Sequence, residues 1–256
     1  MATDRRHASA ADALLAQEHR RGRLVGVAAF ASIHAMLASV VLTATASTGT
    51  PAPVGPGYAD RPIDHAQRLV DLHAHELEHT IAVGLRVAGL VLVALVGLHL
   101  WTLVRTRDAR VATKPTLWLT FAGPGLVAAS TVIGFVALSD VAQQFVAAGG
   151  GTTARARELI DDSSLLRAAN SGDTISRLVL ALWLGFIAVA AMKVGLLTRF
   201  LGYWGMAAAA AFVVLPIGDA LLAGWMGCLG ALMLGYWPGG RPAAWSATTP
   251  QPIDAV

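Results

Sequence analysis

Long apolar runs alternate with short polar segments along most of the chain. Few charges interrupt residues 24–46, 81–104, 116–138 and 174–197. A helix rises about 1.5 Å per residue, so each run is long enough to cross a hydrocarbon core of about 30 Å. We therefore predict a transmembrane helix over each range.

The last apolar stretch, Leu201 to Trp237, is too long for one span, and Pro216 and Asp219 interrupt it. This pattern predicts two shorter spans over 202–216 and 219–237, joined by a tight hairpin, with Asp219 as a helix cap. Small residues in the last span favour close helix packing, and they are Gly224, Gly227 and Gly230. The predicted fold is an all-α integral membrane bundle of about six transmembrane helices.

The third predicted span contains Gly123-Pro124-Gly125 near its middle. Proline removes one backbone donor, and the glycines on either side let a neighbouring helix or a water molecule approach the freed carbonyl group. We therefore expect a kink in this helix.

The first span could instead be a cleaved signal peptide, because Ala44-Thr45-Ala46 resembles a cleavage site after an apolar stretch. The apolar cores of signal peptides usually have about 7 to 15 residues. This run is longer, which favours a retained helix.

The composition agrees with a membrane protein, since 55% of the residues are hydrophobic and 14% are charged, against roughly 25% charged in soluble domains. Cys228 is the only cysteine, which excludes an internal disulfide or a cysteine-rich zinc site. The net charge of +3 is explained by membrane topology and attraction to anionic lipid. We find no nucleic-acid-binding motif.

The basic residues predict the orientation, because short positively charged segments stay in the cytoplasm. The leader and the second connection are rich in arginine, and the first connection is rich in carboxylates. We predict a cytoplasmic leader over 1–22, a bundle over 23–237 and a cytoplasmic tail over 238–256. Both termini then lie inside the bacterial cytoplasmic membrane.

The segment HELEH at residues 75–79 has the H-E-x-x-H form, by which one helix presents two imidazoles to zinc. We expect it on a helix that starts near Pro62 and continues without a break into the second span. Asp71, His75 and His79 share a face, but they extend over about 12 Å, too far to bind one ion. A third ligand would have to come from Asp140 or from the two neighbouring carboxylates of Asp161 and Asp162. The favoured interpretation is a solvated helical extension, with zinc at His75 and His79 as the alternative; no other cofactor is assigned.

Four ionisable side chains inside or near the spans are further candidates, because their burial is costly. Arg86 and Asp140 could form an ion pair that fixes helix register, or a path for protons or substrate. His34 and His99 could in principle hold a haem between them. At about 1.5 Å per residue, however, they lie about 17 Å and about 9 Å from the inner boundary, and these depths differ too much for both to bind one haem. Hydrogen-bonded packing roles are therefore expected for both histidines.

Two segments carry a family resemblance: MKVGLLTRFLGYWGM at 192–206 and LGALMLGYWPGGRPAAW at 229–245. They resemble an uncharacterised actinobacterial family of multi-pass membrane proteins with an M-x-V-G-L-L-T-R-F segment and a C-terminal W-P-G-G-x-P-x-A-W ending. The resemblance implies an integral, multi-span protein and supplies no catalytic residues.

Together these patterns favour a non-enzymatic role that is structural, partner-binding or concerned with small solutes. The expected partners are membrane lipid and a membrane or cytosolic protein. One alternative is a transporter or proton-coupled device that uses Arg86 and Asp140. The other is a metal-binding sensor or metallo-hydrolase that uses the HELEH segment.

Overall fold

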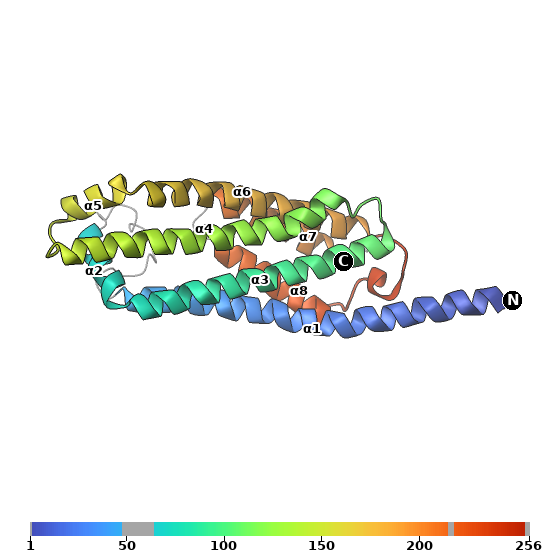
Figure 1. Ribbon diagram of the computed structural model, residues 1–256. Helices are drawn as coiled ribbons and strands as arrows, with labels where there is room; N and C mark the ends of the chain where they lie inside the picture. Colours follow the sequence, from blue (N-terminus) through green and yellow to red (C-terminus); the bar gives the residue numbers. More distant parts are fainter. Residues whose placement is uncertain (1, 48–63, 215–217, 254–256) are drawn as a thin grey trace. The chain divides into compact units, whose positions relative to one another are not determined.

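The described part of the chain is almost entirely helical. The structure is a computed structural model that describes residues 2–47, 64–214 and 218–253, with side chains from residue 12 onward. Within these ranges the chain forms eight α-helices, one short 3-10 helix and no strand. They are α1 (Ala2–Ala46), α2 (His65–Ala74), α3 (Glu76–Arg107), α4 (Lys114–Ala147), α5 (Thr153–Asp162), α6 (Ser164–Lys193), α7 (Arg199–Val214), α8 (Gly218–Leu234) and the 3-10 helix η2 (Ala243–Ser246) (Figure 1). The all-α prediction is confirmed.

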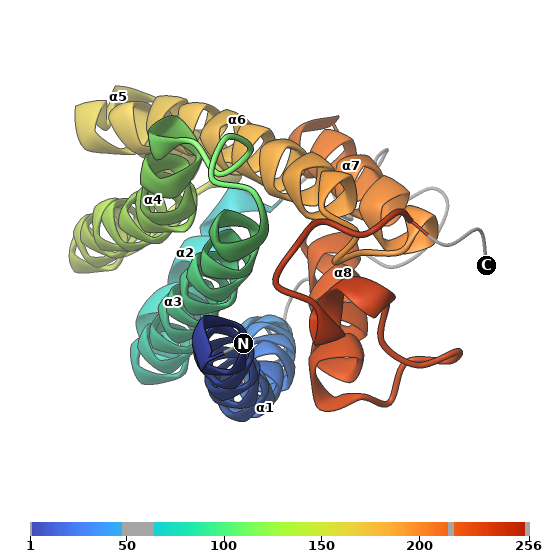
Figure 2. The ribbon, with the colours of Figure 1, turned by 90° about the vertical axis from the view of Figure 1, so that its right-hand side faces the viewer.

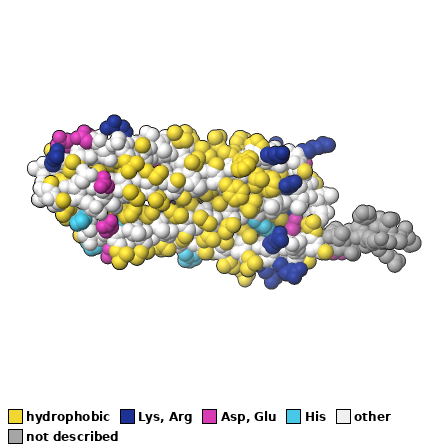
Figure 3. All heavy atoms as spheres, viewed as in Figure 1, with side chains coloured by type: hydrophobic (Ala, Val, Ile, Leu, Met, Phe, Trp, Pro, Cys, Tyr) yellow, Lys and Arg dark blue, Asp and Glu magenta, His cyan; other side chains and the backbone are white. Residues whose placement is uncertain are grey.

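Four helices are long and apolar enough to cross a membrane. They are residues Asp12–Ala46 of α1 together with α3, α4 and α6, while α7 and α8 are shorter apolar helices. Large apolar side chains such as Leu24, Trp118 and Phe186 are 74%, 73% and 53% exposed, and Figure 3 shows many such side chains on one face. Soluble proteins rarely expose large contiguous apolar patches. These helices support a membrane protein, while the number and limits of the spans stay predictions.

Two sequence predictions fall outside the described residues. The predicted helix start near Pro62 lies within residues 48–63, and the proline of the predicted hairpin, Pro216, lies within 215–217. On the described side of that turn, Asp219 lies in the first turn of α8.

The proline of the third predicted span lies inside one continuous helix, α4. A Cβ atom added at Gly123 would lie 3.0 Å from the Leu180 Cα, so the backbone of α6 approaches α4 closely there. A Cβ atom at Gly125 would meet no atom within 4 Å. The close helix approach expected at this triplet is thus present at Gly123, and the kink itself stays a prediction.

The chain divides into two compact units. Unit one comprises residues 1–33, 89–125 and 177–256, and unit two comprises residues 34–88 and 126–176. Helices α1, α3, α4 and α6 each contribute residues to both units. Unit one also contains α7, α8 and η2, and unit two contains α2 and α5.

In unit one, the core is built around the fully buried Trp183 of α6. Its indole Nε1 donates a hydrogen bond to the Thr120 Oγ1 of α4 at 3.0 Å, and a Cβ atom at Gly97 of α3 would lie 2.2 Å from the Trp183 ring. Helix α8 also packs closely on α1, because Cβ atoms at Gly227 and Gly230 would lie 3.0 Å from the side chains of Ile33 and Phe30. The glycines of the sixth predicted span therefore do mark a close helix contact.

In unit two, an apolar cluster joins α2 to α4 and α5. Its buried members are Leu69, Leu72, Val141, Ala142, Phe145 and Ala156. Asp64 caps α2 by accepting hydrogen bonds from the N–H groups of Ala66 and Gln67, and it also accepts one from the Thr153 hydroxyl group at 2.6 Å. Donation by Thr153 is the main cause that holds the pKa of the Asp64 carboxyl group below its ordinary value. The N-cap of α2 is thereby linked to the first residue of α5.

The expectation of one unbroken helix through HELEH is wrong. Helix α2 ends at Ala74, and His75 is its C-cap with φ −120° and ψ 36°. Helix α3 begins at the next residue, and its first turn carries Glu76 and Glu78, whose carboxylates suit the positive end of a helix dipole. The break lets α2 pack its apolar face on α4 and α5 instead of continuing along the axis of α3.

Candidate functional site at the C-terminal junction

The two motif segments of unit one end their helices in the same way. After α6, Leu196 N–H donates to the Ala191 carbonyl group and Gly195 N–H donates to the Met192 carbonyl group, both at 2.9 Å. After α8, Tyr236 and Gly235 make the same pair of bonds to Ala231 and Leu232 at 2.8 and 3.1 Å. Gly195 and Gly235 have φ values of 78° and 86°, which favour glycine. Each motif is therefore a helix end of the Schellman type.

The second motif folds back onto the first. Trp245 of η2 is 2% exposed, and its indole Nε1 donates to the Leu196 carbonyl group at 2.9 Å. Gln251 N–H donates to the Val194 carbonyl group at 3.3 Å. A Cβ atom at Gly195 would lie 2.3 Å from the Gln251 carbonyl oxygen, so only glycine allows this approach. We call residues 194–200 and 235–253 together the C-terminal junction.

Arg241 holds the turn of the junction against the end of α8. Its guanidinium group donates to the carbonyl groups of Leu232, at 3.2 Å, and Met233. It also lies over the Trp245 ring, 5.6 Å from the ring centroid. Burial lowers the pKa of Arg241 below its ordinary value, and the nearby Arg23 cation adds to the effect. Because arginine stays protonated at neutral pH, the group is a partly desolvated cation.

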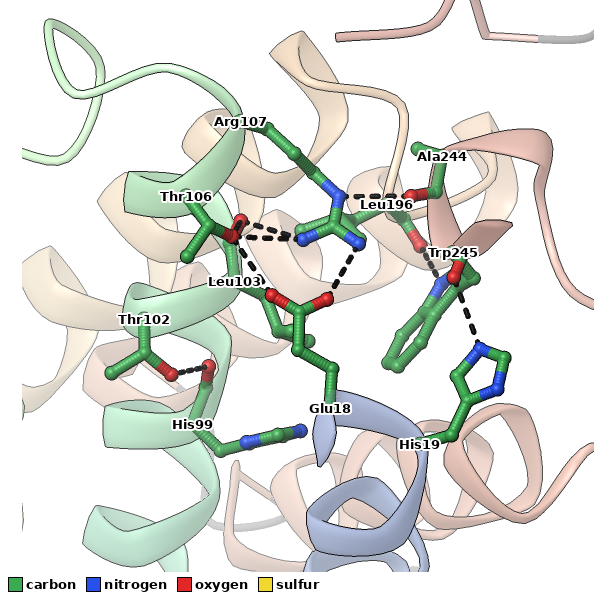
Figure 4. A network of polar contacts seen from close by, with 10 residues as sticks. All are labelled: Glu18, His19, His99, Thr102, Leu103, Thr106, Arg107, Leu196, Ala244 and Trp245. Atoms are coloured by element: carbon green, nitrogen blue, oxygen red, sulfur yellow. Dashed lines mark hydrogen bonds and ion pairs between the residues drawn. The ribbon is translucent and has the colours of Figure 1, made fainter. Parts of the chain in front are cut away.

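A polar network ties the junction to α1 and α3 (Figure 4). Arg107, at the end of α3, donates from Nε to the Ala244 carbonyl group at 2.8 Å and pairs through Nη2 with the Glu18 carboxylate at 3.0 Å. The side chains of Arg107 and Glu18 are 1% and 13% exposed. The His19 ring nitrogen Nε2 lies 3.1 Å from the Trp245 carbonyl oxygen. Residues near both ends of the chain are therefore fixed to the same end of α3.

A cavity of about 220 Å³ lies within the junction. Residues from both motifs line it, together with Ile253. The rings of Phe200 and Trp237 on its wall are stacked with centroids 6.2 Å apart. The other side chains with polar atoms on the wall include Arg241 and Thr198. The wall thus combines a cation and a hydroxyl group with flat apolar surfaces.

The HELEH histidines lie in unit two, at the break between α2 and α3. The His75 Nδ1 atom lies 3.7 Å from a Glu78 carboxylate oxygen. His79 Nε2 is buried and has no hydrogen-bond partner among the residues described. In that same part of the chain, no group of three or more His, Cys, Asp and Glu side chains is arranged to hold a metal ion. Zinc at His75 and His79 stays a prediction.

The intramembrane candidates are divided between the two units. Asp140 in unit two is exposed, and its carboxylate accepts a hydrogen bond from the Gln144 amide at 3.0 Å. Arg86 is half-buried in the same unit, and its pairing with Asp140 stays a prediction. His34 is exposed in unit two, whereas His99 in unit one is 8% exposed, and its Nε2 has no hydrogen-bond partner within the described ranges.

Sequence reasoning missed Glu18 and Arg107 as partners. Glu18 lies in the predicted leader and Arg107 in the second connection, and their separation of 89 positions hides the pairing. By sequence alone the WPGGRPAAW ending predicts the end of a helix at Pro238 and the glycines, with Trp237 at the membrane interface. It does end α8, and in addition its last tryptophan is buried against the other motif.

Comparison with known proteins identifies a family. Searches of curated proteins and of solved structures give no significant match. The profile of one family, described as Domain of unknown function (DUF4386), matches residues 51–237. The match covers most of the chain and includes the first motif and the start of the second. The chain therefore belongs to the DUF4386 family, whose function is uncharacterised.

Proposed function

We propose that this protein is a non-enzymatic, six-span protein of the bacterial cytoplasmic membrane that binds a small anionic solute at the C-terminal junction. The observation that carries the proposal is the cavity between the two motifs. Its wall offers the Arg241 cation beside the stacked rings of Phe200 and Trp237. A flat apolar body with one negative charge complements such a wall.

The start of α7 adds to this preference for an anion. Thr198 and Phe200 on the cavity wall flank the first residue of α7, Arg199. The first N–H groups of a helix lack partners within the helix and carry partial positive charge. The lining contributes a guanidinium group, a hydroxyl group and ring faces, which supports binding over catalysis. The Thr198 hydroxyl group caps α7 by accepting a hydrogen bond from the Leu201 N–H group at 3.3 Å, and its own proton is still available to an anion.

The network around Arg107 supports the proposed topology. Glu18 near the start of the chain and Ala244 near its end both bond to Arg107. The connection that follows, with Arg110 and Lys114, is positively charged, as expected for a cytoplasmic segment. Both termini would then face the cytoplasm, where the junction cavity is open to soluble metabolites.

Benzoate is a suitable probe, because it has a flat ring and one carboxylate. We expect saturable binding of benzoate to the detergent-purified protein by equilibrium dialysis, and weaker binding of the neutral analogue benzyl alcohol. Phe200→Ala should raise the benzoate Kd about two- to tenfold, because an aromatic contact of this kind contributes about 0.5–1.5 kcal/mol.

Phe121→Ala is the matched control, because Phe121 is similarly exposed, at 48% against 58% for Phe200, and lies on α4 away from the cavity. It should leave the benzoate Kd unchanged. A binding free energy of only about 4 kcal/mol corresponds to a Kd of about 1 mM. The proposal therefore fails if benzoate shows no saturable binding at concentrations up to about 10 mM.

A further inference from the structure

Two cavities lie next to each other on α6 in unit one. One, of about 370 Å³, lies where the α3–α4 connection meets α6. The other, of about 490 Å³, lies between α6 and α7. Phe186 and Val189 line both, so the two cavities adjoin at these residues of α6. Figure 2 shows α6 beside α7 on one side and the start of α4 on the other. We call the combined feature the α6 groove.

The inner part of the α6 groove is apolar along its whole length. Besides Phe186 and Val189, its wall includes Leu178, Ala181, Leu182, Gly185, Met206 and Val213. Leu182 and Phe186 are 55% and 53% exposed. A Cβ atom at Gly185 would meet no atom within 4 Å. The glycine therefore leaves space that no protein atom fills.

The other end of the α6 groove carries two cations. Arg110 and Lys193 line it together with the hydroxyl-bearing Thr113 and Thr116. Both cationic side chains belong to exposed residues. Among the described residues neither has an ion-pair partner. The groove is therefore polar and positive at one end and purely apolar over the rest.

The length of the α6 groove matches one leaflet of a bilayer. Lys193 and Leu178 are separated by fifteen positions on α6, or about 22 Å at 1.5 Å per residue. One leaflet together with its headgroup region is about 20–22 Å thick, which is half of the roughly 40–45 Å of a whole bilayer. An acyl chain that starts beside Lys193 can thus lie in the groove over its full depth.

We propose that the α6 groove binds one anionic phospholipid of the cytoplasmic leaflet. Its phosphate lies between Arg110 and Lys193, and one acyl chain runs along α6 past Gly185. This inference rests on the proposed topology, in which the α3–α4 and α6–α7 connections face the cytoplasm. It does not depend on ligand binding at the junction cavity, which has a separate lining.

The test is a titration of delipidated protein in detergent with phosphatidylglycerol, followed by native mass spectrometry. We expect one tightly bound phosphatidylglycerol per chain, and weak binding of phosphatidylcholine. Arg110→Gln with Lys193→Gln should weaken phosphatidylglycerol binding about 30-fold, since each cation near a membrane surface contributes about fivefold. Inorganic phosphate should not displace the lipid, because it cannot fill the apolar part of the groove.

Gly185→Leu tests the acyl-chain part of the groove without removing a charge. It should weaken lipid binding at least tenfold and leave the thermal midpoint of the protein within about 2 °C. Gly84→Leu is its control, because a Cβ atom at Gly84 of α3 also meets no atom within 4 Å. Arg20→Gln with Arg199→Gln is the charge control, which removes two exposed cations outside the groove.

Three results would overturn the inference. The first is a Kd for phosphatidylglycerol that stays within twofold of that of the unaltered protein in both groove variants. The second is a loss of phosphatidylglycerol binding in the control variants that equals the loss in the groove variants. The third is that the unaltered protein is a dimer, and that Gly185→Leu converts it to a monomer without changing its lipid content. That result would show that the groove binds a second copy of this chain. A protein that stays dissolved without detergent would instead refute the membrane topology itself.

Discussion

Replacing Arg107 with alanine is expected to lower the free energy of unfolding by about 3–5 kcal/mol. The Arg107 side chain is 1% exposed, and its removal leaves the Glu18 carboxylate without its cation and the Ala244 carbonyl group without its donor. A buried charge that loses its partner cannot be resolvated without opening the structure. The measurement is unfolding by SDS in mixed micelles, followed by tryptophan fluorescence.

Arg20→Ala is the control for this substitution. Arg20 is exposed and lies two positions after Glu18, so its loss should change stability by less than about 0.5 kcal/mol. The double variant Glu18→Gln, Arg107→Met should recover part of the stability, because it leaves no unpaired charge. If Arg107→Ala and Arg20→Ala cost the same, the network does not hold the junction.

Replacing Trp245 with alanine is expected to cost a similar amount, about 3–5 kcal/mol. The side chain is 2% exposed and donates to the Leu196 carbonyl group, so its removal leaves a cavity and an unpaired acceptor. We also expect η2 and the residues after it to detach. Limited proteolysis of the purified protein should then cleave after η2 much faster than in the unaltered protein.

Two further variants separate packing from hydrogen bonding at this position. Trp245→Phe keeps most of the ring volume and loses the indole donor, so it should cost about 1 kcal/mol. Trp118→Ala removes a tryptophan that is 73% exposed and should leave the proteolysis rate unchanged. Equal cleavage rates in Trp245→Ala and the unaltered protein would contradict the docked arrangement of the tail.

The helices were predictable because each apolar run is long and uninterrupted. The runs at 24–46, 81–104 and 116–138 all lie inside single helices, α1, α3 and α4. The pattern could not show where the helices extend past the apolar part, since polar residues continue a helix as readily as apolar ones. Nor could it show the break at His75, which depends on the packing of α2 against α4 and α5.

The C-terminal junction was only partly predictable. The glycines after α6 and α8 are visible signals for a helix end, and the aromatic residues around them suggest burial or an interface. The contact between Trp245 and Leu196 spans 49 positions, and no local pattern encodes it. The Glu18–Arg107 pair is hidden for the same reason, because a buried ion pair and two exposed cytoplasmic charges look identical in sequence.

The membrane topology underlies both binding proposals, and cysteine labelling tests it directly. With Cys228 changed to serine, single cysteines are placed at two exposed positions, Arg157 in α5 and Thr249 in the tail. In intact cells a membrane-impermeant maleimide should label the cysteine at 157 and should label the one at 249 only after the membrane is permeabilised. Labelling at 249 in intact cells would contradict the topology.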